Sequence, residues 1–258
     1  MKRGAITVVA ALALLCATGA VAFAATQIGT SGPDNLVGTA DPDQLYGEDG
    51  DDQLSGLGSN DYLEAGPGND SVEGGDGGDL VIGGTGDDHV DAGPGNDVVY
   101  AGAGDDLVLG GAGRDILFGQ AGSDRLFGGS NADTIYASIG DDFVDAGSGP
   151  DRVYSDDGDV TITAGAGNDI VSAVGGRATV DGGPGFDRIR TGPDNDLVIG
   201  GNGSDSIDTG PGDDVIKVRD KRQDRVRCGP GFYTVIADRS DVLIGCEKKG
   251  RTRGARIR

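Results

Sequence analysis

Several residue types that usually build cores and active sites are rare in this chain of 258 residues. It has no tryptophan, one histidine, three cysteines and 5% aromatic residues. A chain of this length normally forms a thick globular core, but so few large side chains do not support one. Zinc binding and His-based catalysis are also not predicted, because His89 is the single histidine and no His and Cys cluster exists in the sequence.

Positive charge is scarce through most of the chain. Residues 26–216 contain 38 Asp and Glu against six Lys and Arg, which gives a net charge of −32. This charge repels the phosphates of nucleic acids, so no nucleic-acid binding is expected along this part. Without bound cations, mutual repulsion favours a disordered polyanion over a folded domain.

Glycine is abundant, with 51 residues, and it recurs at a fixed spacing. From Gly29 to Lys217 the chain consists of 21 nonapeptides without an inserted or deleted residue, with the pattern G-G-x-G-x-D-x-U-x, where U is aliphatic. Position eight is Leu, Val or Ile in all 21 units, position six is Asp in 19 and position four is Gly in 17. The glycines permit a tight turn with positive φ, and x-U-x predicts a short strand with only U inside. Two units then form one 18-residue coil, with the odd units stacked along one edge and the even units along the other.

This nonapeptide resembles the calcium-binding repeat of RTX, or haemolysin-type, proteins over about three quarters of the chain. The resemblance implies an all-β fold, a right-handed parallel β-roll (β-solenoid) of about ten 18-residue coils over residues 26–217. Hard oxygen ligands from Asp and from turn carbonyls are what Ca²⁺ prefers. The expected metal ligands are the position-six aspartates Asp34, Asp43, Asp52, Asp61, Asp70, Asp79, Asp88, Asp97, Asp106, Asp115, Asp124, Asp133, Asp142, Asp151, Asp169, Asp187, Asp196, Asp205 and Asp214.

The two edges differ in their supply of carboxylates. The resemblance implies that ions are shared between units n and n + 2, so the even edge has ten consecutive aspartates, whereas the odd edge loses two at Val160 and Ala178. This predicts at most about 16 calcium ions. It also predicts that residues 150–185 are the softest stretch of the rod, because only packing and the ions of the opposite edge hold it. Gly is replaced at position four by Asp41, Ser59, Asn131 and Asp194, which is expected to weaken those turns.

Both chain ends depart from the repeat. Residues 1–25 carry Lys2 and Arg3, an uncharged apolar run and a small-residue cleavage site, which predicts a signal peptide and a secreted or cell-surface protein. After cleavage no stable membrane span is expected. The alternative is an uncleaved anchor, because the uncharged run from 4 to 25 is long enough to span a membrane.

Residues 218–247 slip by one residue against the repeat, and Tyr233 stands where an Asp is expected, which predicts a C-terminal cap. In an exported protein Cys228 and Cys246 are expected to form a disulfide, with two free thiols as the alternative. From 217 to 258 there are 13 basic residues against five acidic ones. Residues 248–258 therefore predict a basic disordered tail, with an arm that binds anionic envelope polymers or a membrane surface as the alternative.

Apolar residues recur at the outward positions seven and nine of even units. They are expected either to form a contact patch or only to stiffen the sheet.

The most favoured function is an exported, non-enzymatic calcium-binding protein that folds on Ca²⁺ and acts as a structural or interaction module. A cell-surface adhesin that binds glycans is the first alternative, and an extracellular polysaccharide-modifying enzyme is the least favoured. Ice binding is not predicted, since no regular Thr ladder occupies the outward positions seven and nine.

The predicted contact patch on the even units comprises Leu80, Ile82, Val98, Tyr100, Ile116, Phe118, Tyr136 and Tyr154.

Overall fold

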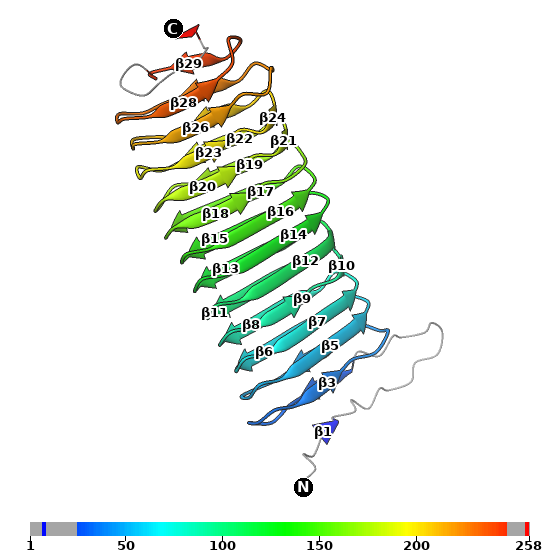
Figure 1. The fold of residues 1–258 in the computed structure, drawn as a ribbon. Helices are drawn as coiled ribbons and strands as arrows, with labels where there is room; N and C mark the ends of the chain where they lie inside the picture. Colours follow the sequence, from blue (N-terminus) through cyan, green and yellow to red (C-terminus); the bar gives the residue numbers. More distant parts are fainter. Residues whose placement is uncertain (1–6, 9–24, 247–255, 258) are drawn as a thin grey trace.

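The computed structural model describes residues 7–8, 25–246 and 256–257. The predicted signal peptide and basic tail lie almost wholly outside these residues and stay predictions. The chain winds in successive coils along one axis, so that residues 25–246 form a rod with its two ends far apart (Figure 1). All regular elements of the described part are β-strands. It contains no helix long and apolar enough to cross a membrane.

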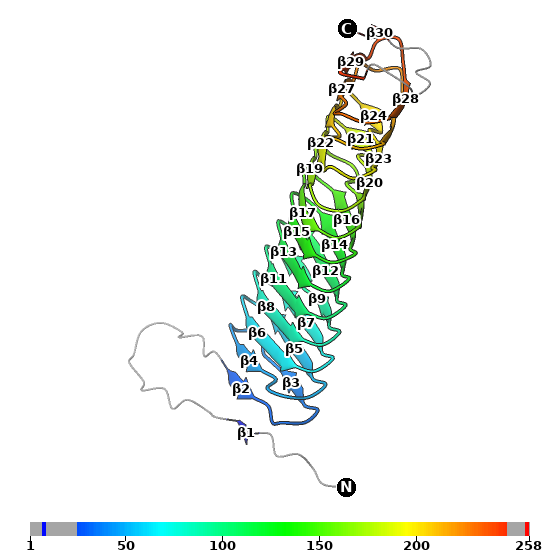
Figure 2. The same cartoon turned by 90° about the vertical axis from the view of Figure 1, so that its left-hand side faces the viewer.

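The coils stack with the period that the repeat predicts. Val98 is paired with Leu80 on one side and with Ile116 on the other, and each step is 18 residues. The strands that follow the turns of even-numbered repeats form one sheet, here called the even sheet. The strands that follow the turns of odd-numbered repeats form the other, here called the odd sheet. Figure 2 shows the two rows of strands facing each other across the rod. The predicted all-β parallel β-solenoid is therefore confirmed.

The even sheet has 15 strands in the order β1-β2-β4-β6-β8-β11-β13-β15-β17-β19-β22-β25-β27-β29-β30, parallel except for the β1–β2 pair. Its bounds are β1 Thr7–Val8, β2 Thr26–Ile28, β4 Gln44–Tyr46, β6 Tyr62–Pro67, β8 Leu80–Thr85, β11 Val98–Ala103, β13 Ile116–Ala121, β15 Thr134–Ile139, β17 Arg152–Asp157, β19 Ile170–Ala173, β22 Arg188–Thr191, β25 Ser206–Asp208, β27 Arg225–Arg227, β29 Val242–Ile244 and β30 Arg256–Ile257.

The odd sheet has 13 strands, of which β10 pairs only with β12 beside the main order. Its bounds are β3 Asn35–Val37, β5 Gln53–Gly58, β7 Ser71–Asp76, β9 His89–Asp91, β10 Pro94–Gly95, β12 Leu107–Gly113, β14 Arg125–Ser130, β16 Phe143–Ser148, β18 Val160–Thr163, β20 Ala178–Asp181, β23 Leu197–Ile199, β26 Val215–Val218 and β28 Thr234–Ala237. A third sheet pairs β21 Pro184–Gly185 with β24 Asn202–Gly203.

The core is a thin stack with one aliphatic side chain for each strand. Position-eight residues such as Leu63, Val81 and Val99 are completely buried, and small residues at position one, such as Ala101, line the same interior. A buried Leu, Val or Ile contributes about 1.5–3 kcal/mol. Fixing the nine backbones of a unit costs roughly 9–18 kcal/mol. Hydrophobic burial is therefore too small by itself to order a unit.

Close stacking dictates the glycines of the turns. Gly84, at position two, has φ of +124°, and an added Cβ there would collide with the carbonyl oxygen of Gly66 in the preceding coil. Where position two is not Gly, the backbone keeps positive φ, as at Leu57 (φ +76°) and Gln120 (φ +76°). Ser59 also keeps positive φ at position four, so a turn without its glycine still closes.

The coils continue beyond the last nonapeptide. Strands β27, β28 and β29 pair with β25, β26 and β27 in the same parallel order, so residues 225–244 lengthen the rod. The rod therefore extends past the residues 26–217 assigned to the β-roll. The frame slip arises in the turn between Val215 and Arg225. Val215 pairs with Leu197 and Arg225 pairs with Ser206, so this turn has one residue more than the equivalent turn of the preceding coil.

Candidate calcium sites

Each position-six Asp lies in the turn directly before a strand and links two coils. Asp97, just before β11, accepts a hydrogen bond on Oδ1 from the backbone N–H of Asp79 (2.7 Å). The N–H of Asp97 in turn donates to Oδ1 of Asp115 (2.9 Å). The same bond repeats every 18 residues along the even edge and along the odd edge outside the gap at Val160 and Ala178, for example from Asp88 N–H to Asp106 Oδ1 (2.8 Å). One oxygen of each carboxylate is thus used by the fold itself, between the units n and n + 2.

The second oxygen, Oδ2, is different. Asp97 and Asp115 are each 0% exposed, yet Oδ2 of both has no hydrogen-bond partner. A buried unpaired polar atom costs about 1–3 kcal/mol, and more when it is charged. The buried Oδ2 atoms without a partner belong to Asp52, Asp61, Asp70, Asp79, Asp88, Asp97, Asp106, Asp115, Asp124, Asp133, Asp142, Asp151, Asp169, Asp187, Asp196, Asp205, Asp214 and Asp224.

Other oxygens face the same space. A Cβ added at Gly83 would collide with Asp88 Oδ2 and with the carbonyl oxygen of Ala101, so both point at this position-one glycine. Within the described residues no three His, Cys, Asp or Glu side chains gather into a metal cluster. A cation held by Oδ2 would therefore take its remaining ligands from carbonyls, and a hard oxygen set of this kind fits Ca²⁺.

Burial changes the acidity of these groups. Desolvation, together with the negative charge of the aspartates in adjacent coils, raises the pKa of Asp88, Asp97 and Asp151 to about 7. For Asp106 the same causes raise the pKa to about 6. Hydrogen bonds from backbone N–H groups act in the opposite direction but do not outweigh desolvation. The turns therefore favour either protonation or a bound cation over an unpaired carboxylate.

The first aspartate of each edge is an exception to the unpaired Oδ2. Asp34 Oδ2 accepts from the backbone N–H and the hydroxyl of Thr30. Asp43 Oδ2 accepts in the same way from the backbone N–H and the hydroxyl of Thr39. Both are among the predicted ligands, but the protein itself satisfies the oxygen that is left free in later coils.

Comparison with known proteins assigns the repeats to a family. The RTX calcium-binding nonapeptide repeat matches residues 28–63, 46–81, 55–90, 82–117, 109–144, 118–153, 145–180 and 181–216. The chain belongs to this RTX repeat family. The fold is similar to the X-ray crystal structure of a hyperactive, Ca²⁺-dependent, β-helical antifreeze protein from an Antarctic bacterium, with a TM-score of 0.54 and 23% sequence identity, covering 83% of this chain and 77% of that one. A comparison with curated protein sequences found no match.

At the odd-edge gap in the RTX repeats, backbone carbonyls take over two of the three missing carboxylate contacts, and the N–H of Ala178 still donates to Asp196 Oδ1 (2.8 Å). Val160 and Ala178 are buried at position six. The N–H of Asp142 donates to the carbonyl of Asp159 (3.1 Å), and the N–H of Val160 donates to the carbonyl of Arg177 (3.1 Å). Outside the turn, the Arg177 guanidinium forms an ion pair with Asp159 (2.7 Å). The expectation that packing alone holds this edge was therefore incomplete, because backbone bonds and an ion pair replace part of the carboxylate ladder.

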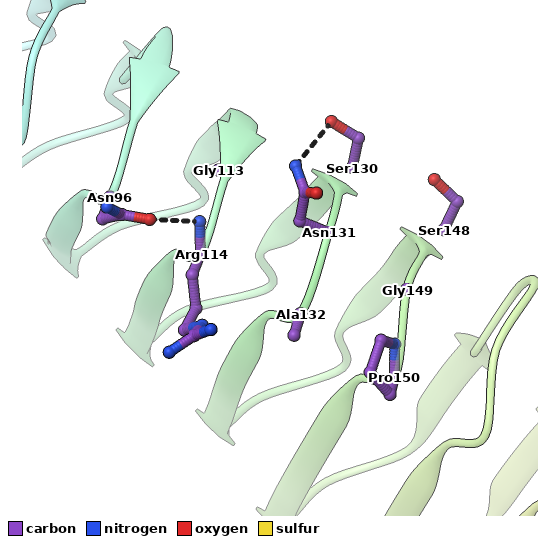
Figure 3. A pocket seen from close by; sticks show the side chains of 9 residues that line it. All are labelled: Asn96, Gly113, Arg114, Ser130, Asn131, Ala132, Ser148, Gly149 and Pro150. Atoms are coloured by element: carbon purple, nitrogen blue, oxygen red, sulfur yellow. Dashed lines mark hydrogen bonds between the residues drawn. The ribbon is translucent and has the colours of Figure 1, made fainter.

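Sequence reasoning also missed a second ladder, at position five on the outside of the turns. Here the side chain accepts from the following coil, as when Asn69 Oδ1 accepts from the N–H of Asp87 (3.0 Å). Asn96 likewise accepts from the N–H of Arg114 (2.9 Å), which Figure 3 shows. On the even edge this outer ladder is interrupted after Arg114, because the side chains of Arg114, Ala132 and Pro150 provide no acceptor, and a shallow hollow lies there. The ladder resumes at Asn168, which accepts from the N–H of Phe186 (2.9 Å). The signal for this ladder was the frequent Asn or Asp at position five.

The predicted contact patch is brought together on the even sheet. Tyr100, Phe118, Tyr136 and Tyr154 pair in register, and their rings stack with centroid distances of 4.7, 4.8 and 5.1 Å. The interplanar angles are 2°, 5° and 16°, so the rings cover one another's faces. The remaining residues of the patch, Leu80, Ile82, Val98 and Ile116, lie beside them in the register of the same sheet. What this ladder exposes is ring edges and tyrosine hydroxyls.

The odd edge ends with a disulfide and an aromatic side chain. Cys228 and Cys246 are bonded, with Cα atoms 5.0 Å apart and a sequence separation of 18. Arg227 pairs with Ile244, a step of 17, so the bridge joins Cys228 to the residue just after its register position in the next coil. Tyr233 occupies the position-six place, as its sequence position predicts, and is buried. Its hydroxyl donates to the carbonyl of Gly245 (2.8 Å). These contacts close the odd edge without any carboxylate.

Proposed function

We propose that the protein binds calcium ions along both edges of the rod and folds when it binds them. The observation that supports this most is the row of buried position-six carboxylates whose Oδ2 atoms have no partner. Each ion would be held by Oδ2 and by carbonyls of the turn, and the ion supplies the positive charge that the buried carboxylates lack. Binding then offsets the repulsion of the −32 charge over residues 26–216.

Seventeen of the nineteen predicted aspartates keep an unpaired Oδ2, and we assign the ions to these. Asp34 and Asp43 are proposed to bind more weakly, because Thr30 and Thr39 already donate to them. The proposal keeps at most about 16 ions within the repeats, with none at Val160 and Ala178.

A calcium titration tests this function directly. The oxidised mature chain, stripped of metal at neutral pH, should give the circular dichroism spectrum of a disordered chain. Added calcium in the ~10⁻⁴–10⁻³ M range typical of extracellular modules should restore the β-sheet spectrum cooperatively. A spectrum that excess chelator leaves unchanged would rule out folding on calcium.

Export and a non-enzymatic role belong to the same proposal. The N-terminal sequence has the pattern of a signal peptide, and a disulfide persists in oxidising compartments. At the concentrations of extracellular calcium such a chain would fold after export and act as a structural or interaction module. Fractionation of cells, with the mass of the mature N-terminus, tests export and cleavage together.

A surface adhesin that binds glycans is the second candidate, and the stacked rings of Tyr100, Phe118, Tyr136 and Tyr154 favour it. Because the rings cover one another's faces, contact with a sugar would use ring edges and hydroxyls. Substitution of the three tyrosines by Phe keeps the stack and removes the hydroxyls. Loss of binding in a glycan pull-down would support the adhesin, and its absence in the wild type would reject it.

Two other roles are less favoured. An extracellular polysaccharide-modifying enzyme needs a distinguished pair of carboxylates, whereas the turns repeat the same group at every coil. The structurally similar β-helical protein is an antifreeze protein. We do not extend that activity to this chain, because the even sheet presents Ile82 and aromatic rings at position nine and no regular Thr ladder.

A further inference from the structure

The C-terminal segment 218–246 follows no nonapeptide, yet it contains four aspartates in two turns of the rod. They are Asp220, Asp224, Asp238 and Asp241. Asp224 lies directly before β27 and accepts on Oδ1 from the N–H of Asp205 (2.8 Å), and its own N–H donates to Asp241 Oδ1 (3.2 Å). The even-edge ladder of the RTX repeats therefore continues through Asp224 to Asp241, across the one-residue slip.

Three of these aspartates have both oxygens occupied by the protein. Asp220 accepts from the N–H groups of Gly203 and Arg222. Asp238 accepts on Oδ2 from the N–H of Lys221, and its Oδ1 lies 3.9 Å from the Arg219 guanidinium.

Asp241 accepts on Oδ1 from Asp224 N–H and on Oδ2 from Asp238 N–H. At the end of the ladder the Oδ2 of Asp241 is therefore hydrogen-bonded by the protein, as the Oδ2 of Asp43 is by Thr39 at the start. Within the described part of this segment, Asp224 alone has a buried side-chain oxygen without a partner.

Asp224 shares the features of the repeat sites. It is 1% exposed, its Oδ1 is used by the preceding coil and its Oδ2 has no partner. Asp205 in the coil before has the same unpaired Oδ2 and is 3% exposed. Two adjacent buried carboxylates on one edge, each with a free oxygen, need positive charge that no neighbouring donor supplies to Oδ2.

We propose that Asp224 is the ligand of a further calcium ion, shared with Asp205, at the last turn of the even edge and outside the nonapeptide repeats. The site rests on the calcium binding proposed above. It fastens the N-terminal end of β27, whose C-terminal end is fastened by the disulfide of Cys228. The last coils are thus closed by an ion on one edge and by a covalent bond on the other, and Asp241 ends the row.

The test compares three variants of the oxidised full-length mature chain. Asp224→Asn keeps an oxygen that accepts from Asp205 N–H, but it removes the charge and replaces Oδ2 by a donor. Asp213→Asn is the control, because it removes an exposed position-five carboxylate and keeps the oxygen that accepts from the N–H of Phe232. Asp169→Asn is the positive control within the repeats, where Oδ2 is unpaired. Bound calcium is counted by equilibrium dialysis, and hydrogen exchange is followed in the peptide that contains β27.

Asp224→Asn is expected to bind one ion fewer than the wild type and to lose the calcium-dependent protection of β27, while Asp213→Asn keeps both. Asp169→Asn should lose at least one ion, because Asp169 is shared with Asp151 and Asp187, and should keep the protection of β27. If Asp224→Asn binds as many ions as the wild type while Asp169→Asn loses one, the inference fails and the proposed function stands. If the wild type binds no calcium, the proposed function itself fails. Equal protection of β27 by magnesium alone would overturn the assignment to calcium.

Discussion

Acid should substitute for calcium in folding this rod. The perturbation is a fall in pH from about 7.5 to 5 in metal-free buffer. Burial raises the pKa of Asp88, Asp97 and Asp151 to about 7 from an ordinary value of 3.8. The folded metal-free chain therefore binds more protons than the unfolded chain. Its stability must rise as the pH falls through the folded pKa, and the gain is complete below the unfolded value.

The magnitude follows from the size of the shift. A pKa of about 7 for Asp97 against 3.8 corresponds to about 4 kcal/mol once the pH is below 3.8, at about 1.36 kcal/mol for each pKa unit. Between pH 7.5 and pH 5 about two of these units, or ~2.7 kcal/mol, are gained. Three such groups already match the 5–15 kcal/mol by which a typical domain is stable. Protonation of several buried carboxylates is thus large enough to decide whether the metal-free chain folds.

The assay is circular dichroism of the chain freed of metal by a chelating resin, titrated from neutral pH downward. The β-sheet signal should appear between about pH 7 and pH 5, and added calcium should no longer increase it at the acid end. High salt at neutral pH is the control for general charge repulsion, because it screens exposed charges but not buried ones. The reasoning is refuted if the metal-free chain is equally disordered at both pH values, or if salt alone folds it.

Three further outcomes are expected. Asp97→Asn should lose an ion and raise the calcium concentration at the folding midpoint, whereas Asp105→Asn, at an exposed position-five site, should leave both nearly unchanged in dialysis and circular dichroism. Hydrogen exchange at limiting calcium should leave residues 155–181 at least as protected as residues 83–118, since the gap has its own backbone bonds; faster exchange there would restore the softness that the sequence alone predicts. Mass spectrometry of unreduced protein should find neither Cys228 nor Cys246 alkylated, and two modified thiols would contradict the disulfide.

The period of the sequence determined most of the fold in advance. The nine-residue spacing with one aliphatic residue in each repeat predicts that Val81 and Val99 lie inside. Both belong to even-numbered repeats, which predicts that they lie in the same sheet, as observed. The inward Asp at position six was equally predictable, because it precedes each strand at a fixed distance. Tyr233 could be recognised as a replacement for Asp from the same count.

What the period could not predict is how each oxygen is used. The sequence does not show that Oδ1 of Asp97 is already taken by a backbone N–H while Oδ2 is not. Nor does it distinguish Asp43, which Thr39 satisfies, from an aspartate with an unpaired oxygen. Asp224 was missed for a different reason, because one inserted residue in its turn moves it out of the frame that identified the others.

The two repeats with Val160 and Ala178 at position six show which features the solenoid fold requires when the proposed calcium ligand is absent. Both coils keep their core residues Ile162 and Val180 buried. At their edge the N–H groups of Asp142 and Val160 donate to carbonyls, and the N–H of Ala178 donates to Asp196 Oδ1. A coil without a position-six carboxylate therefore still closes, and it carries no buried unpaired charge at that position. The proposed need for calcium therefore arises from the carboxylates and not from the solenoid. In this proposal, an Asp placed where Val or Ala can pack makes folding of its coil conditional on a cation, and its repetition along both edges makes the whole rod responsive to calcium.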